Sequence, residues 1–274
     1  MVGSNGAGKS TLIQILTRLL EPTGGEAWIN GSPVSELFGE RWGQIGYISE
    51  EQKWPGWMTI EGLIEYLRPF YPTWDRALEK RLLNEFQLPR KRKLKNLSRG
   101  MRMKAAFAAT LPFRPSVLIL DEPLSGLDPL VRDELIASLQ ELRREGAGFT
   151  TFLSSHDLGE LESFATHVGF LDQGRMLFSE EMATLKERYR RIRFSVEVSI
   201  TAARDTVPSH WIQMTQHSGV VEVVHDAYQE GVEAEVERVF PGARDVVIEA
   251  MPLRAIFLAT AKARRAALAK EAEA

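Results

Sequence analysis

Gly3-Ser4-Asn5-Gly6-Ala7-Gly8-Lys9-Ser10, followed by Thr11, is the stretch of sequence that decides the fold. It fits the pattern G-x-x-x-x-G-K-[ST], in which glycines let successive backbone N–H groups point at one anion. An apolar pattern with helical spacing follows over residues 11–20, and the N-terminus of such a helix adds partial positive charge. We therefore predict a nucleoside triphosphate site, with Lys9 at the β- and γ-phosphates and the Ser10 hydroxyl on Mg²⁺.

The composition is that of a globular protein with one or two domains, since the chain has 274 residues and is 44% hydrophobic. The balance of 34 basic and 37 acidic residues argues against a protein whose main task is to coat nucleic acid. The absence of cysteine excludes a disulfide scaffold, a zinc ribbon and a thiol nucleophile. No apolar run approaches the roughly 18–20 residues that a membrane-spanning helix needs.

Strands alternate with helices over about the first 180 residues, which predicts a mainly parallel sheet. The wholly apolar run Val117–Leu120 is typical of a strand buried on both faces. Helices are expected over 60–86 (in two pieces, broken near Pro69 and Pro72), 101–111 and 130–145, and a strand over 149–153.

The pattern changes near residue 190 and predicts a small α+β appendage. A hairpin turning at 172–175 is expected before this change. The expected elements of the appendage are a strand over 193–199, a hairpin over 211–226 turning at Ser218-Gly219, a helix over 231–240, a strand over 245–249 and a helix over 253–274. We place the domain boundary between residues 188 and 189, so the fold class is α/β with a C-terminal α+β domain.

Two carboxylates, Asp121 and Glu122, follow the apolar strand directly. Asp121 suits an Mg²⁺ site, reached through water, and Glu122 suits a base that takes a proton from an attacking water molecule. The alternative is a pair of carboxylates that only caps the end of a strand, and the phosphate loop makes that alternative weaker.

Three further segments carry polar groups that suit phosphate chemistry. Leu97-Ser98-Arg99-Gly100-Met101 precedes a helix, so Ser98 and the backbone near Gly100 form either a second anion site or an ordinary helix cap. Ser125-Gly126-Leu127-Asp128 is a tight polar loop after the carboxylates. His156, after the next strand, either contacts a γ-phosphate or is a structural histidine.

The order and spacing of these segments resemble the nucleotide-binding subunits of ABC transporters. Residues 3–11 are similar to the Walker A loop of that family, 97–101 to its signature motif and 117–122 to its Walker B strand. Residues 124–128 resemble its D-loop and 154–157 its H-loop. The resemblance covers residues 2 to about 180 and implies a phosphate-loop NTPase domain with the helical subdomain of that family.

The resemblance also implies a mechanism and partners. Two such domains pack head to tail, and each ATP with its Mg²⁺ lies between the Lys9 loop of one domain and the Ser98 loop of the other. Glu122 is then the general base, and His156 holds the γ-phosphate. The expected partner is a separate transmembrane permease, and no nucleic-acid partner is expected. The chain is then expected on the cytoplasmic face of the membrane, with export as the favoured direction of transport.

Three departures from the family pattern stand out. Only Met1 and Val2 precede the phosphate loop where the family has further strands, so we interpret the chain as an N-terminally truncated gene model or fragment. The position of the family's glutamine is Glu50, which joins Ser10 and Asp121 as an expected Mg²⁺ ligand. Arg99 and Met101 replace the commoner glycine and glutamine of the signature.

Two surface features complete the prediction. Nine basic residues and no acidic ones lie between Glu85 and Asp121, which indicates a solvated face or attraction to lipid headgroups or triphosphate. The aromatic loop Trp54-Pro55-Gly56-Trp57-Met58 follows the Glu50 position, where the family receives a helix of the permease. Core packing is the equally open alternative for this loop.

Two alternative functions remain open. A soluble ABC ATPase that acts on ribosomes or DNA is disfavoured, because such proteins carry two cassettes or a long insertion and this chain has one copy of each motif. A non-catalytic remnant is favoured by the short N-terminus and opposed by the intact Lys9, Glu122 and His156.

Overall fold

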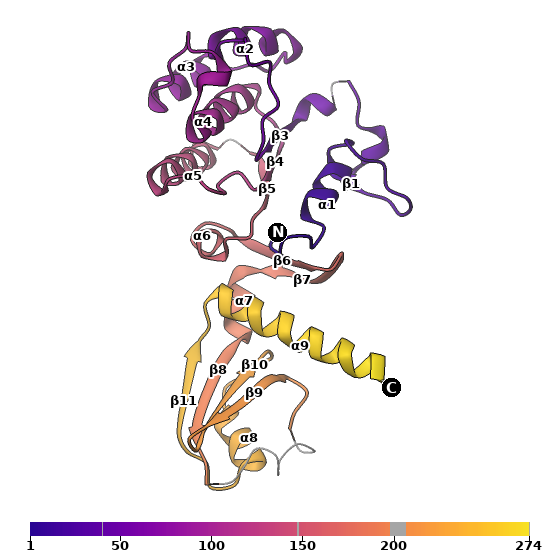
Figure 1. Cartoon of the computed structure of the whole chain (residues 1–274), viewed down its shortest axis with the longest axis vertical. Coiled ribbons are helices and arrows are strands. Elements are labelled where there is room, and N and C mark those ends of the chain that lie inside the picture. The colour runs from indigo at the N-terminus through magenta and orange to yellow at the C-terminus, as the bar shows by residue number, and fades with distance from the viewer. Residues whose placement is uncertain (40, 147, 198–206, 274) are drawn as a thin grey trace. The chain divides into compact units, whose positions relative to one another are not determined.

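The computed structural model describes residues 1–39, 41–146, 148–197 and 207–273 (Figure 1). The chain divides into two compact units, Met1–His156 and Asp157–Ala274. The predicted domain boundary at residue 188 was placed from the sequence pattern and stays a prediction. In the part of the chain that the structure describes, no helix has both the length and the apolar character needed to cross a membrane.

A three-stranded parallel sheet forms the centre of the first unit. Its order is β3 (Ile45–Ser49), β4 (Val117–Asp121) and β5 (Thr150–Ser154). The strands end in step, since Ser49 lies opposite Asp121 and Asp121 lies opposite Ser154. Every residue of β4 is buried, which confirms the predicted strand with two covered faces and the parallel sheet.

Alternate residues of the sheet face two different layers of helix. Val117 and Ile119 belong to one hydrophobic cluster with Ile13, which lies on helix α1 (Lys9–Leu16). On the other face, a Cβ placed on Gly46 of β3 would lie 2.7 Å from the Thr110 side chain of helix α4 (Arg99–Thr110). Glycine at position 46 therefore allows α4 to lie close against the sheet.

The remaining helices of the first unit follow the predicted pattern closely. The predicted 60–86 helix is divided, as expected near Pro69, into α2 (Ile60–Leu67) and α3 (Arg76–Glu85), and Figure 1 shows both near α4. The Thr59 hydroxyl caps α2, and the Asp75 carboxylate caps α3 by accepting the Leu78 N–H at 2.9 Å. Helix α5 runs over Pro129–Arg144.

Short elements connect the larger ones. Strands β1 (Trp28–Ile29) and β2 (Ser32–Pro33) form a hairpin. Its turn is Asn30-Gly31, with positive φ at both residues, as a two-residue turn requires. Single 3₁₀ turns lie at Val34–Glu36, Trp42–Gln44, Arg68–Phe70, Leu94–Asn96 and Leu111–Phe113.

Helix α1 is shorter than predicted, since it ends at Leu16 and not near Leu20. The Thr17 hydroxyl donates to the Ile13 carbonyl at 2.8 Å, and Arg18 takes a left-handed conformation with φ +51°. That conformation is the usual end of a helix, although glycine is the residue that normally adopts it. The apolar residues beyond it are exposed, including Leu19 at 64%.

The second unit begins with helix α6 (Leu158–Glu162), strands β6 (His167–Asp172) and β7 (Arg175–Glu181), and helix α7 (Met182–Arg188). Strands β6 and β7 form the predicted hairpin, and its turn residues Gln173 and Gly174 both have positive φ. The turn chemistry at 172–175 was therefore sufficient to predict it.

An antiparallel sheet follows in the second unit. Its order is β11 (Arg244–Ala250), β8 (Arg190–Ser195), β10 (Val220–His225) and β9 (Trp211–His217). The hairpin predicted to turn at Ser218-Gly219 is confirmed. The strand predicted over 193–199 starts and ends earlier, at Arg190 and Ser195, and its residues 198 and 199 lie outside the described residues. The predicted helices are α8 (Val232–Val239) and α9 (Leu253–Glu273).

One hydrophobic core joins this sheet to α8. Ile192 and Phe194 of β8 pack with Val221 and Val223 of β10 and with Val236 of α8, and all five side chains are almost fully buried. The period of two along each strand places these residues on one face. The predicted α+β character of the C-terminal part is therefore confirmed.

Candidate functional site

The phosphate loop, residues 3–10, curls around the ammonium group of its own lysine. The Lys9 Nζ donates to the carbonyl oxygens of Gly3 at 2.9 Å and Ser4 at 3.3 Å, and only 6% of the residue is exposed. Gly6 and Gly8 have φ values of +80° and +104°, a conformation that glycine adopts without a steric cost. The motif glycines therefore form the tight turn that the sequence predicted.

The same loop presents the N-terminus of α1. The first bond of the helix runs from the Leu12 N–H to the Gly8 carbonyl at 2.9 Å. The N–H groups of Lys9, Ser10 and Thr11 therefore have no acceptor within the helix and point out of its N-terminal end. A helix end with free N–H groups and a lysine fits the charge and shape of a phosphate group.

Asp121 and Ser154 lie side by side at the carboxyl ends of β4 and β5. The Ser154 hydroxyl donates to Asp121 Oδ1 at 2.6 Å, and both side chains are buried. Burial, and next to it the negative charge of Asp121, raises the pKa of Tyr47 on β3 above its usual value. The bond from Ser154 thus holds the Asp121 carboxylate in one orientation.

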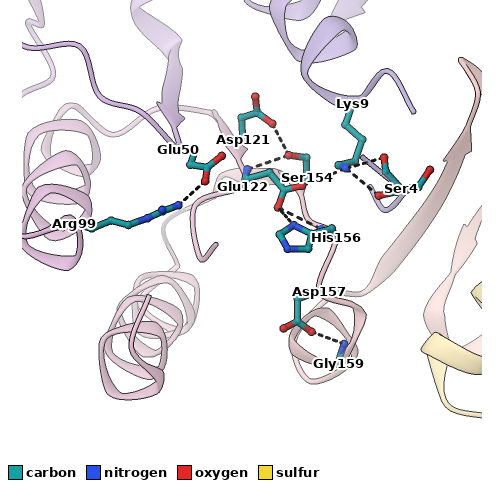
Figure 2. A network of polar contacts seen from close by, with 11 residues as sticks. Ser4, Lys9, Glu50, Arg99, Asp121, Glu122, Ser154, His156, Asp157 and Gly159 are labelled. Atoms are coloured by element: carbon teal, nitrogen blue, oxygen red, sulfur yellow. Dashed lines mark hydrogen bonds and ion pairs between the residues drawn. The ribbon is translucent and has the colours of Figure 1, made fainter. Parts of the chain in front are cut away.

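Glu122 connects the phosphate loop with the segment after β5 (Figure 2). Its Oε1 lies 3.2 Å from Lys9 Nζ, and its Oε2 lies 2.8 Å from His156 Nδ1. The Glu122 N–H donates to Ser154 Oγ at 3.0 Å, and its φ of +49° is unusual for a residue with a side chain. Three predicted site residues, Lys9, Glu122 and His156, therefore meet at one point, and the Glu122 side chain is only 12% exposed.

Ser154 is the functional residue that the sequence did not assign a role. It lies in the predicted motif 154–157, and its hydroxyl contacts both acidic residues by donating to Asp121 and accepting from Glu122. Its signal was its position, since the last residue of one parallel strand lies beside the last residue of the next.

The donor set at this site fits Mg²⁺. The hydroxyl of Ser10 and the carboxylate of Asp121 are hard oxygen ligands of the kind that Mg²⁺ takes, together with water and phosphate oxygens. Ser10 is exposed at the N-terminus of α1, and Asp121 directly precedes Glu122, whose carboxylate contacts Lys9 of the phosphate loop. Their roles as metal ligands stay predictions.

The signature segment, residues 97–101, starts α4. The Ser98 hydroxyl accepts the Met101 N–H at 3.3 Å, which is the helix-cap arrangement considered from the sequence. Leu97 is buried, while Ser98 and Arg99 are exposed. A cap and an anion contact are compatible for one exposed hydroxyl, so contact of Ser98 with a nucleotide on a second chain stays a prediction.

The loop of residues 125–128 forms the second part of the connection between β4 and α5. The Asp128 carboxylate caps α5 by accepting the Leu130 N–H at 2.9 Å, and the Ser125 N–H donates to the Glu122 carbonyl at 3.2 Å. Leu127 is buried, and Gly126 has a φ of +62°. The loop is therefore tied to the residue that is predicted to act as the base.

Glu50 lies directly after β3, where its carboxylate forms an ion pair with the Arg99 guanidinium (Figure 2). The neighbouring Gln52 turns back and donates to the Ser49 carbonyl at 3.1 Å. The sequence marked Glu50 and Arg99 as two separate departures from the family pattern. Their contact joins residues 49 positions apart, which no local pattern could show.

A second polar cluster lies in the C-terminal unit, where His210 Nε2 and Glu235 Oε1 are 2.7 Å apart and His225 Nε2 is 3.7 Å from the same oxygen. The His225 Nδ1 accepts the Ala227 N–H at 3.1 Å, so a neutral His225 carries its proton on Nε2, toward Glu235. A metal-binding histidine needs that lone pair free and an acceptor for its other nitrogen. We therefore interpret this cluster as a hydrogen-bond network.

The phosphate loop, the parallel sheet and the paired carboxylates together are those of a phosphate-loop nucleotide-binding protein. A family model described as ABC transporter matches residues 1–125. An uncharacterized ABC transporter ATP-binding protein of Alkalihalophilus pseudofirmus is 31% identical over 198 residues, which cover 69% of this chain and 71% of that protein. The chain therefore belongs to the family of ABC transporter ATP-binding proteins.

Two further comparisons agree with this assignment. BcrA of Bacillus licheniformis, a bacitracin transport ATP-binding protein, is 29% identical over 233 residues, which cover 84% of this chain and 73% of BcrA. A solved ATP-binding subunit of an ABC transporter aligns with a TM-score of 0.61 at 29% identity, covering 68% of this chain and 79% of that chain. The chain spans only 52% of a Synechocystis relative and 61% of YcbN of Bacillus subtilis, both also named ABC transporter ATP-binding proteins.

Proposed function

We propose that this chain binds ATP with Mg²⁺, hydrolyses it, and drives transport through a separate transmembrane permease. The observation that carries the proposal is the meeting of Lys9, Glu122 and His156 at the N-terminus of α1. Membership in the family of ABC transporter ATP-binding proteins supports ATP as the nucleotide.

Each of the three residues has a role that its position supports. Lys9 and the N–H groups of the phosphate loop bind the β- and γ-phosphates, and Mg²⁺ bound at Ser10 and Asp121 supplies further positive charge. Glu122 accepts the proton of the attacking water. His156 lies 2.8 Å from the Glu122 carboxylate and orients it, while its exposed ring reaches the γ-phosphate.

ATP hydrolysis by the purified chain, with and without Mg²⁺, tests this proposal. The variant Glu122→Gln keeps the size of the side chain and removes the base, so we expect the rate to fall by about 10²–10⁴-fold. The matched control is Glu51→Gln, an exposed carboxylate outside the site. A Glu122→Gln rate equal to that of the control would show that Glu122 is not the base.

A second copy of the chain, or a related domain, is proposed to complete the site. Ser98 and Arg99 are exposed at the N-terminus of α4, where the signature segment can contact an ATP bound to the other domain. We expect Glu122→Gln to form an ATP-dependent dimer in size-exclusion chromatography, since slow hydrolysis leaves the ATP that joins the two domains intact. Adding Ser98→Arg is expected to abolish that dimer, and an unchanged dimer would contradict the head-to-tail arrangement.

The aromatic loop of residues 54–58 is proposed as the contact with the permease. Trp57 is 71% exposed, and the loop is fixed by bonds from the Lys95 N–H to the Gly56 carbonyl and from the Leu94 N–H to the Met58 carbonyl. An exposed, fixed tryptophan favours docking over core packing. Trp57→Ser should reduce co-purification with the proposed permease, and ATP binding should be unchanged.

Export is the direction that we propose for transport, and we propose a compound similar to bacitracin as the first cargo to test. The 233-residue match to the bacitracin transport protein is longer than the predicted ATPase domain of 188 residues, so the similarity includes part of the C-terminal region. Expression of the chain with its permease should change the susceptibility of a host to bacitracin if the cargo is similar. Unchanged susceptibility would leave the ATPase in place and point to another cargo.

A further inference from the structure

The carboxyl edge of the parallel sheet carries three acidic residues, and one of them is neutralised by an unusual partner. Ser49 lies opposite Asp121 in the sheet, so the next residues, Glu50 and Glu122, leave neighbouring strands at the same edge. Lys9 offsets the charge of Glu122, and the Ser154 hydroxyl bonds to Asp121. Glu50 is paired with Arg99, about half of each side chain being exposed.

Arg99 occupies a position where a helix disfavours a cation. It is the first residue of α4, whose first turn holds no acidic side chain, and Arg102 follows one turn later. The N-terminus of a helix carries partial positive charge, so arginine there opposes helix stability. The Glu50 carboxylate, by contrast, is well placed beside that helix end. Arg99 is therefore explained by its pairing with Glu50 and not by the helix.

The guanidinium of Arg99 also lies against a second loop. A Cβ built on Gly126 would lie 3.1 Å from Arg99 Nη1 and 3.2 Å from its Cζ, which is closer than carbon atoms normally approach. Gly126 has a φ of +62°, so glycine is favoured there by its backbone as well. Arg99 thus contacts the segment after β3 through Glu50 and the segment after β4 through Gly126.

We infer that Arg99 is a positioning residue that holds the Glu50 carboxylate at the N-terminus of α4 and against Gly126, so that the pair acts as one neutral unit at the nucleotide site. The inference rests on the proposed function for its effect on ATP. With Arg99 in place, Glu50 adds no net negative charge beside Asp121 and Glu122. Without Arg99, the free carboxylate repels the triphosphate.

A cycle of variants tests the pair: wild type, Glu50→Gln, Arg99→Gln and the double variant. We expect Arg99→Gln to raise the KM for MgATP by about threefold to tenfold with kcat within twofold, because repulsion acts on binding. The double variant should return to within about twofold of the wild-type KM. Arg99→Lys keeps the charge without the planar group that lies on Gly126, so it should rescue the KM in part.

A readout without nucleotide separates this inference from the proposed function. In thermal unfolding of the nucleotide-free chain, the loss in Tm of the double variant should be smaller than the sum of the two single losses. The control cycle, Glu51→Gln with Arg102→Gln, uses exposed residues and should be additive. If the wild type fails to hydrolyse ATP, the proposed function fails while this Tm cycle still reports on the pair.

Two results would overturn the inference. The first is additive Tm changes for Glu50 and Arg99, which would show that the ion pair does not form in solution. The second is a Glu50→Gln variant that needs several-fold more Mg²⁺ for half-maximal ATPase while Arg99→Gln needs the same amount as the wild type. That result would make Glu50 a direct metal ligand and not the partner of Arg99.

Discussion

Replacing Gly46 by alanine is expected to destabilise the first unit, because the added methyl group has no space. The new Cβ would lie 2.7 Å from Thr110 Cγ2, 2.9 Å from Leu118 Cδ1 and 3.2 Å from Pro115 Cγ. Leu118 is fully buried in the central strand, and Thr110 is the last residue of α4. Both close atoms are methyl groups of packed side chains, so the contact is relieved only by strained rotamers or by a shift of α4 away from the sheet.

The size of the effect follows from overpacking in comparable cores. One extra carbon in a filled space costs about 1–3 kcal/mol. With a urea m-value of about 2 kcal/mol/M, the unfolding midpoint should fall by about 0.5–1.5 M. Tryptophan fluorescence is a suitable probe, since five of the six tryptophans lie in the first unit and only Trp211 lies in the second.

The chain offers a matched control in Gly43, three residues earlier. A Cβ on Gly43 would meet only Tyr71 Cδ1, at the ordinary contact distance of 3.9 Å. Gly43→Ala should therefore leave the midpoint unchanged or raise it, since alanine loses less backbone freedom on folding. Equal midpoints for Gly46→Ala and Gly43→Ala would refute the argument that glycine sets the distance between α4 and the sheet.

Three further outcomes are expected. Burial, and then the charge of His210, lowers the pKa of His225, so below pH 6.5 the unfolded chain binds a proton that the folded chain does not. The free energy of unfolding should therefore fall as the pH is lowered from 7.5 to 5.5, and His225→Gln should reduce that loss in urea titrations. Asp75→Ala removes the cap of α3 and the partner of Arg114 and should cost about 1–2 kcal/mol in the same assay, whereas Asp75→Asn, which keeps the cap, should cost less. Gln173→Asn should raise the Tm slightly, because asparagine tolerates the φ of +47° in the β6–β7 turn better, and an unchanged or lower Tm would contradict this.

Local chemistry predicted the elements whose signals lie within a few residues. The turns at Gln173-Gly174 and Ser218-Gly219 were predicted because a polar residue followed by glycine favours a two-residue hairpin turn. Such a turn needs positive φ at both residues, and all four residues have it. The predicted end of α1 was wrong because Arg18, and not a glycine, takes the left-handed conformation that ends the helix. Nothing in the arginine side chain indicates this conformation. A helix end of this kind depends on the Thr17 hydroxyl and on the exposure of the residues beyond it.

The candidate site was predictable in its members and not in its contacts. The motif order identified Lys9, Glu122 and His156, and parallel strands that end in step bring them together. The pairing of Glu50 with Arg99 depends on how α4 lies against β3, which is decided by packing far from either residue. The spacing of residues along the chain carries no information on such a contact. The departures from the family pattern at Glu50 and Arg99 are therefore seen to be one ion pair only in the structure.

The matched ends of β3, β4 and β5 have a consequence for how the gene tolerates changes of length. Loss of a single codon within β4 would move every later side chain of that strand by one position and exchange its two faces, so Leu118 and Ile119 would trade layers and the acidic pair would leave the phosphate loop. The same loss within residues 17–26, which form neither helix nor strand, shifts nothing in the sheet. The lengths of these strands are thus constrained, and insertions and deletions can accumulate only in the connecting segments between them.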